Sequence, residues 1–170
     1  MMHSRQLTTT QVVRVAIIAA LYAVFTVAIA PLSYGPIQFR AAEALKVLVL
    51  FDPLYAIGIG IGTFFANLAS PFVGPWELIF MPLTDLAGGW LAWWLYRLMQ
   101  RRWPLVALAV YAMTTSLAVG LMLTALGTGG FWVLAGLVAV PEFIILIGGY
   151  PLMLGVLRLL QARGIHLEKG

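Results

Sequence analysis

Three charged side chains stand out in this sequence, because Arg40, Glu43 and Lys46 follow one another at intervals of three residues. The chain as a whole is 62% hydrophobic and only 9% charged. A charge inside a lipid bilayer is costly unless it finds a partner, water or a ligand, so charges there mark functional sites. The stretch 36–46 therefore predicts a binding site for a polar solute.

The elements that must hold these charges are long apolar runs. No charged residue occurs in the runs 15–39, 53–76 and 103–141. Each run exceeds the roughly 20 residues that a helix needs to cross the hydrocarbon of a bilayer. We therefore predict an all-α integral membrane protein, multi-pass in the cell membrane, with residues 1–170 forming one transmembrane domain.

Six helical segments are expected in this domain. The second is the weakest prediction, because its thirteen residues rise only about 20 Å as an α-helix, less than the ~30 Å hydrocarbon core. The uncharged loop before it, residues 32–38, suits irregular backbone folded over a cavity. Pro141 and Pro151 predict kinks in the last segment. The approximate bounds of the segments are 12–30, 39–51, 54–69, 76–99, 104–126 and 131–160.

The positions of lysine and arginine predict the orientation. Cytoplasmic loops of membrane proteins carry an excess of these residues. Six spans with both chain ends in the cytoplasm place eight of the ten basic residues inside. Arg40 and Lys46 then fall in the outer half of the second segment. The net charge of +4 therefore reflects topology and does not point to nucleic acid. The eight residues are Arg5, Arg14, Arg97, Arg101, Arg102, Arg158, Arg163 and Lys169.

This topology brings further polar residues to the level of Arg40 and Glu43. Asn67 and Glu77 lie at outer segment ends, and Asp85 and Glu142 lie deeper in the same half of the membrane. Glu142 is the strongest candidate, because it follows Pro141 in an otherwise uncharged run. We expect an outward-facing pocket formed by Arg40, Glu43, Lys46, Asn67, Glu77, Asp85 and Glu142.

Each of these residues also has a structural interpretation. Arg40 and Glu77 can cap short helices at headgroup level, and Glu43 can pair with Lys46 one turn away. Asp85 can neutralise Arg40 or Lys46, and Asn67 can bond a neighbouring backbone. Nearby aromatic residues form an interfacial belt or stack on a planar, purine-like ligand. These aromatic residues are Tyr34, Phe39, Trp76, Trp132 and Phe143.

Small residues at intervals of four predict close helix contacts. Gly58, Gly62 and Ala66 favour packing inside the bundle. The stripe Ala16–Ala20 and its neighbour Ala19–Ala23 suit either internal packing or a partner protein. There is no phosphate-binding loop, so we expect no ATP hydrolysis by this chain. With no cysteine and with His3 and His166 in opposite tails, we expect no metal and no cofactor.

Three stretches resemble one known family. Residues 16–22, 30–45 and 65–71 are similar to the QueT family, the substrate-binding S components of energy-coupling factor (ECF) transporters linked to uptake of queuosine precursors. The Pro-Ile-Gln-Phe-Arg-x-x-Glu-Ala-Leu block is the most specific part, and Ala42 stands where the family pattern has serine. The resemblance implies a prokaryotic six-helix bundle with cytoplasmic termini and an outer pocket under the loop after the first helix.

The resemblance also implies partners and roles. Ala16 and Ala20 would dock on a transmembrane coupling subunit, and two cytoplasmic ATPases would drive the complex, in which the S component topples to release solute. The implied solute is a 7-deazaguanine base, with its N–H groups on Glu43 or Glu142. Arg40 and Asn67 would orient the site, and Asp85 or Glu77 would pair with an aminomethyl cation.

Three other functions stay open at this point. The chain can be an S component for another vitamin-like solute, because fold alone does not settle the ligand. It can be a self-sufficient secondary transporter with Glu142 or Asp85 as its proton site. It can also be a membrane scaffold whose charges only pair internally.

Overall fold

The protein is built entirely from helices in the part that the structure describes. This computed structural model covers residues 7–35 and 38–164, so Pro36, Ile37 and both tails, with Arg5, His3, His166 and Lys169, lie outside the described residues. Four helical stretches are long and apolar enough to cross a membrane. They are α1 (Thr9–Ala28), η2 with α4 (Trp76–Phe80 and Met81–Leu98), α5 (Pro104–Ala125) and α6 (Phe131–Ala162).

Two of the six expected segments are shorter than a membrane span. Helix α3 (Leu54–Asn67) has 14 residues, and η1 (Ala41–Leu50) is a 3₁₀-helix of 10 residues. A four-residue turn of helix, α2 (Ala30–Ser33), follows α1. The all-α class is thus confirmed, with four helices of spanning length and two shorter apolar ones among the described residues.

Local sequence explains how the long helices begin and continue. Thr8 and Gln11 form a reciprocal capping box at the start of α1, which satisfies two backbone donors. The π-helical turn η2 directly precedes α4, whose second residue is Pro82. The ring and missing N–H of Pro82 disturb the regular hydrogen-bond ladder. Helix α6 continues through both Pro141 and Pro151.

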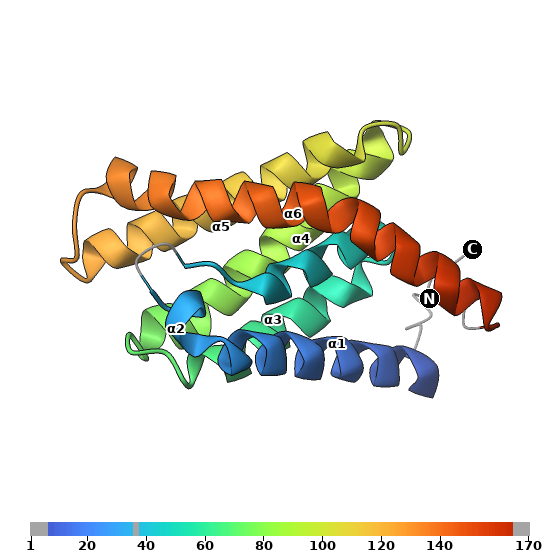
Figure 1. The fold of residues 1–170 in the computed structure, drawn as a ribbon, viewed down its shortest axis with the longest axis horizontal. Coiled ribbons are helices and arrows are strands. Elements are labelled where there is room, and N and C mark those ends of the chain that lie inside the picture. Colours follow the sequence, from blue (N-terminus) through green and yellow to red (C-terminus); the bar gives the residue numbers. More distant parts are fainter. Residues whose placement is uncertain (1–6, 36–37, 165–170) are drawn as a thin grey trace, which may run out of the picture.

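The helices surround η1 (Figure 1). Neighbours pack in the order α1, α3, α4, α5 and α6, while η1 packs against α1, α3, α4 and α6. Helices α1 and α6 are not among the pairs in close contact, so η1 bridges the space between them. Eight of the ten residues of η1 are buried. The segment is therefore the centre of the bundle and not only one wall of a pocket.

Glycines bring α1 and α3 close together. A Cβ at Gly58 would lie 2.9 Å from the carbonyl oxygen of Val15, and one at Gly62 would lie 2.8 Å from both the Ala19 oxygen and the Tyr22 Cβ. Small residues allow such approach between membrane helices. Packing inside the bundle is thus the role of the glycine stripe on α3.

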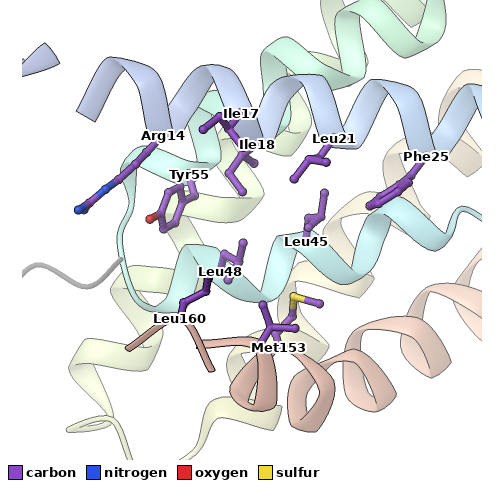
Figure 2. Close-up of a pocket in the computed structure, with 11 residues that line it drawn as sticks. Arg14, Ile17, Ile18, Leu21, Phe25, Leu45, Leu48, Tyr55, Met153 and Leu160 are labelled. Atoms are coloured by element: carbon purple, nitrogen blue, oxygen red, sulfur yellow. The ribbon is translucent and has the colours of Figure 1, made fainter. Parts of the chain in front are cut away.

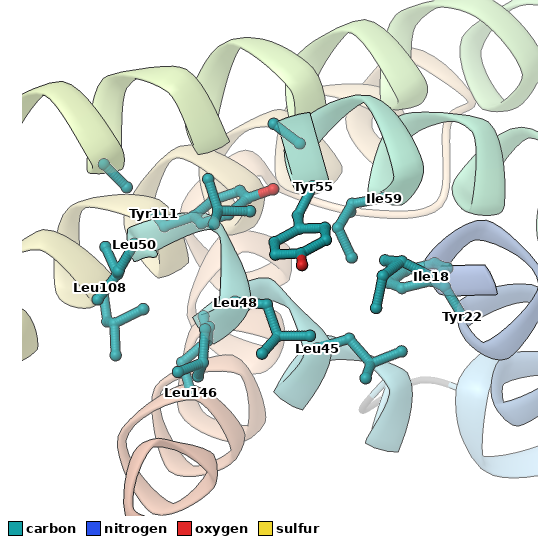
Figure 3. Packing of buried hydrophobic residues seen from close by; sticks show 14 of the residues in the cluster. Ile18, Tyr22, Leu45, Leu48, Leu50, Tyr55, Ile59, Leu108, Tyr111 and Leu146 are labelled. Atoms are coloured by element: carbon teal, nitrogen blue, oxygen red, sulfur yellow. The ribbon is translucent and has the colours of Figure 1, made fainter. Parts of the chain in front are cut away.

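Two apolar clusters fill the bundle. The larger joins η1 to its neighbours through residues such as Leu48, Ile59 and Tyr111 (Figure 3). The smaller contains Met81, Val119, Met122 and Val138 from α4, α5 and α6. Met81, Val119 and Val138 of the smaller cluster line one cavity together with polar residues described next.

Candidate functional site

Lys46 is the centre of a buried cluster of charges. Its side chain is fully buried, and its Nζ forms ion pairs with Glu43, with Asp85 Oδ1 at 2.8 Å and with Glu142 Oε1 at 3.1 Å. It also donates to Thr115 Oγ1 at 3.0 Å. An ammonium has three N–H donors, so four oxygen-bearing side chains share three protons. The site is short of donors.

The 3₁₀ winding of η1 explains the alignment of its charges. A 3₁₀-helix has three residues per turn, so side chains at i and i+3 eclipse each other. Glu43 and Lys46 therefore lie on one face, with Arg40 at the cap of the same helix. In an α-helix, with 3.6 residues per turn, the three positions would drift around the axis. The spacing seen in the sequence matches the winding found in the structure.

Hydroxyl groups fix two of the carboxylates. Tyr22 on α1 donates to Glu43 Oε1 at 2.6 Å, and Thr63 on α3 donates to Asp85 Oδ2 at 2.6 Å. The Tyr111 hydroxyl donates to the backbone oxygen of Asp85 at 2.7 Å, while its ring lies 4.9 Å from Lys46 Nζ. Hydrogen bonds to charged groups are the strong ones. These hydroxyls therefore hold the acids in place around Lys46.

Arg40 closes the cluster on the side of the α1–η1 connection. Its side chain is buried, its Nε donates to the Ser33 oxygen at 3.2 Å, and its guanidinium lies 5.3 Å from the centre of the Tyr34 ring. Tyr34 in turn donates to the Ala66 oxygen at 2.5 Å. Arg40 interacts electrostatically with Glu43 and Glu77. Its position links the central acids to the second polar group.

Asn67 and Glu77 form that second group. Asn67 Nδ2 donates to the backbone oxygen of Glu77 at 2.9 Å, and Ser70 Oγ donates to Glu77 Oε1 at 3.1 Å. Both side chains are fully buried. Within the described residues, Asn67 Oδ1 and Glu77 Oε2 have no hydrogen-bond partner. Buried acceptors of this kind normally have one, so this pair is also short of donors.

Side chains almost fill the central cavity. Its volume is about 10 Å³, which is about what one water molecule needs. Arg40, Glu43, Asp85 and Glu142 line it together with Gln38 and Thr115. Gln38 has a left-handed backbone, with φ of 49°, at the entrance to η1. Lys46, Asn67 and Glu77 do not line this cavity.

The charges of the whole cluster do not balance. Among the described residues that meet here, four carboxylates (Glu43, Glu77, Asp85 and Glu142) face two cations, Arg40 and Lys46. Buried carboxylates without a counter-charge are costly, so they take up protons or bind a cation. The arrangement suits a ligand that donates hydrogen bonds and carries positive charge.

The remaining predicted residues lie elsewhere. Ala16 and Ala20 are exposed on the outer face of α1, whereas Ala19 is buried. Trp132 and Phe39 are exposed, with 78% and 39% of their surface accessible. Sequence analysis missed the hydroxyl partners Tyr22, Thr63 and Thr115. Thr63 could have been found from its spacing, because it precedes the candidate Asn67 by one helical turn and so lies on the same face of α3.

Comparison with known proteins identifies the family. The family model described as QueT transporter matches residues 12–158. The "Queuosine precursor transporter QueT" of Lactococcus lactis subsp. cremoris (strain MG1363) is 41% identical over 64 residues, covering 36% of this chain and 38% of the relative. The match thus spans well under half the length of that curated relative. No solved structure matches the chain.

The family match and the four apolar helices agree on the class of protein. The match runs from within α1 to within α6 and so includes every candidate site residue. Helices of spanning length at both ends of this region make the protein a multi-pass protein of the cell membrane. The chain belongs to the QueT transporter family.

Proposed function

We propose that this protein is the substrate-binding S component of an ATP-driven ECF transporter that imports a queuosine precursor, a 7-deazaguanine base. The observation that carries the proposal is the donor-deficient cluster of four buried carboxylates around Lys46 and Arg40. The family membership and the printed name of the Lactococcus relative support the solute class.

The chemistry of the base suits the missing partners. A 7-deazaguanine presents ring N–H groups and an exocyclic amine, and a carboxylate can accept two adjacent N–H groups. Glu43 or Glu142 accepts these hydrogens, and Arg40 and Asn67 orient the ring. An aminomethyl substituent adds a cation, which pairs with Asp85 or Glu77. The two surplus carboxylates favour a cationic solute over an anionic one.

Binding requires the cluster to open. A cavity of about 10 Å³ admits no base, so the described geometry is a closed state. Lys46 occupies the ring of acids in this state, and its ammonium stands where the donors of a solute would be. We propose that Arg40 and Gln38, which line the cavity, move aside and that Lys46 shifts as the solute enters.

The proposed function also requires partner proteins. We propose one transmembrane domain over residues 1–170, with six helices and both termini in the cytoplasm. Ala16 and Ala20 dock on a transmembrane coupling subunit, and two cytoplasmic ATPases supply the energy. The exposure of both alanines on α1 supports a docking role, because small residues let a partner helix approach.

A binding measurement tests the solute. Purified protein is titrated with 7-aminomethyl-7-deazaguanine, and its melting temperature is followed. We expect saturable stabilisation. Glu142→Gln and Glu43→Gln should each weaken binding about 10- to 100-fold, since a hydrogen bond to a charged group contributes about 1.5–3 kcal/mol. Gln100→Ala, in the exposed loop after α4, serves as control.

Two results would contradict the proposal. If both glutamine variants melt normally and bind the base like the unchanged protein, the site is elsewhere. If cells take up labelled base equally well without any coupling module, the protein is a secondary transporter. Ala16→Trp should abolish uptake in cells that contain the module while leaving binding to the purified chain intact.

A further inference from the structure

A second hollow shares no lining residue with the charged cavity and lies on the outside of the bundle. It has a volume of about 420 Å³ and lies between α1 and α6, with η1 as its floor (Figure 2). Helix α1 contributes Ile17 and Leu21, η1 contributes Leu45 and Leu48, and α6 contributes Met153. This hollow, the α1–α6 groove, exists because α1 and α6 are not in close contact.

The length of the groove along α1 matches the thickness of one leaflet of the bilayer hydrocarbon. Its lining on α1 extends from Arg14 to Phe25 (Figure 2), which is a rise of about 16 Å at 1.5 Å per residue. Half of the bilayer hydrocarbon is about 15 Å thick. Except for Arg14 and the hydroxyl of Tyr55, the lining side chains are apolar.

Arginines mark one end of the groove. The Arg14 guanidinium interacts with the Tyr55 side chain, which holds it at the mouth. Arg163 lines a smaller hollow that shares Val156 and Leu160 with the groove. The first turn of α1 and the last turn of α6 lie at this same end of the bundle (Figure 1). A guanidinium pairs with phosphate through several N–H donors.

We propose that the α1–α6 groove binds one anionic glycerophospholipid. An acyl chain fills the groove along η1, and the lipid phosphate meets Arg14 and Arg163. The lipid packs on Leu45 and Leu48, which line the groove from η1. The bound lipid thereby supports η1, the short central helix that carries Glu43 and Lys46. Lipid binding does not require a solute at the charged cluster.

Native mass spectrometry of purified protein with bound lipid tests this. Phosphatidylglycerol and phosphatidylcholine with identical chains are the probes. We expect one tightly held phosphatidylglycerol per chain. Leu21→Trp, which fills the groove, should lower retention of both lipids at least 10-fold. Val24→Trp is the matched control, because Val24 lies on α1, is 60% exposed and does not line the groove.

The headgroup is tested separately. Arg14→Gln should reduce the preference for phosphatidylglycerol over phosphatidylcholine at least threefold, whereas Arg102→Gln, in an exposed loop, should leave it unchanged. Equal retention of lipid by Leu21→Trp and Val24→Trp overturns the acyl-chain site. The same conclusion holds if Leu21→Trp retains lipid but no longer binds a partner protein, because the groove is then a protein interface. An unchanged preference in Arg14→Gln overturns the anionic headgroup.

A probe on the unchanged chain covers the case in which a variant fails to fold. Phosphatidylglycerol with a photoreactive group midway along its acyl chain is cross-linked to the wild-type protein, and the labelled peptides are mapped. Labelling concentrated at Leu21, Leu45 and Met153 supports the groove. Labelling spread evenly over outward residues such as Val24 and Ile144 overturns it.

Discussion

At the scale of single residues, one ammonium controls the geometry of the site. Lys46 is bound by acids from η1, α4 and α6 at once, so it joins three elements that are far apart in the sequence. A buried ion pair contributes little net stability, but removing one partner leaves a charge uncompensated. The cluster is therefore more sensitive to the loss of Lys46 than to the loss of any single acid.

Lys46→Met tests this asymmetry. Removal of the ammonium leaves Glu43, Asp85 and Glu142 facing one another, so we expect a loss of about 3–5 kcal/mol in unfolding free energy. That corresponds to roughly 6–20 °C in melting temperature for a chain of this size. Adding Glu142→Gln to Lys46→Met should restore part of the loss, because one carboxylate charge disappears.

Thermal melting of the purified variants in one detergent is the measurement. Arg102→Met, a change at an exposed loop position, controls for the loss of a positive charge and should shift the melting temperature by less than ~2 °C. If Lys46→Met melts like Arg102→Met, the ion pairs do not hold the three elements together.

Sequence reasoning offered the candidate residues and two of the ion pairs, those of Lys46 with Glu43 and with Asp85, but not the pair with Glu142. Charges such as Arg40, Glu43 and Glu142 are conspicuous because a bilayer penalises them. Hydroxyl side chains carry no such penalty and occur throughout membrane helices. Tyr22 and Thr63 were therefore hard to recognise as site residues from the sequence. That Lys46 reaches Asp85 and Glu142 at the same time as Glu43 depends on how η1 meets α4 and α6, which no local pattern encodes.

At the scale of elements, the unusual winding of η1 links sequence to site. An apolar stretch at 39–51 indicated a short helix, but composition does not distinguish a 3₁₀-helix from an α-helix. Long 3₁₀ runs are uncommon because their hydrogen bonds are poorer. Packing on several sides by α1, α3, α4 and α6 maintains this one, and the winding keeps Glu43 in line with Lys46.

Close contact between α1 and α3 is the second feature at this scale. Gly62→Ala would place a Cβ 2.8 Å from the Ala19 oxygen and the Tyr22 Cβ. We expect the helices to separate, at a cost of about 1–3 kcal/mol, and the hydrogen bond from Tyr22 to Glu43 to lengthen. Melting temperature and affinity for the base should both fall.

Gly136→Ala is the matched control for this change. Gly136 lies in α6, and a Cβ there meets no atom within 4 Å. Alanine replaces glycine favourably in a helix by about 0.5–1 kcal/mol, so the control should be neutral or slightly stabilising. Equal effects of the two substitutions would show that the contact between α1 and α3 has no special role.

At the scale of the whole molecule, charge separates the two ends of the bundle. The α5–α6 turn lies at one end of the bundle, while the arginine-rich loop between α4 and α5, the first turn of α1 and the last turn of α6 lie at the opposite end (Figure 1). Glu142 of the charged cluster lies in the half of α6 that follows the α5–α6 turn. Hydropathy predicts the helical class because apolar runs must satisfy their backbone internally. The length of the stretch 39–51 already indicated that the second segment cannot span alone, but its 3₁₀ winding and its burial among four helices depend on its neighbours.

The orientation predicted from these charges can be measured directly, because the chain contains no cysteine. Thr128→Cys places a thiol in the exposed α5–α6 turn, and Gln100→Cys places one in the exposed loop between α4 and α5. The two loops lie at opposite ends of the bundle (Figure 1). By the excess of arginine around Gln100, that loop should face the cytoplasm. In intact cells, a membrane-impermeant maleimide should therefore label Thr128→Cys strongly and Gln100→Cys only after permeabilisation. The reverse pattern would place the charged cluster toward the cytoplasm, and a solute could then not reach it from outside without a full inversion of the bundle.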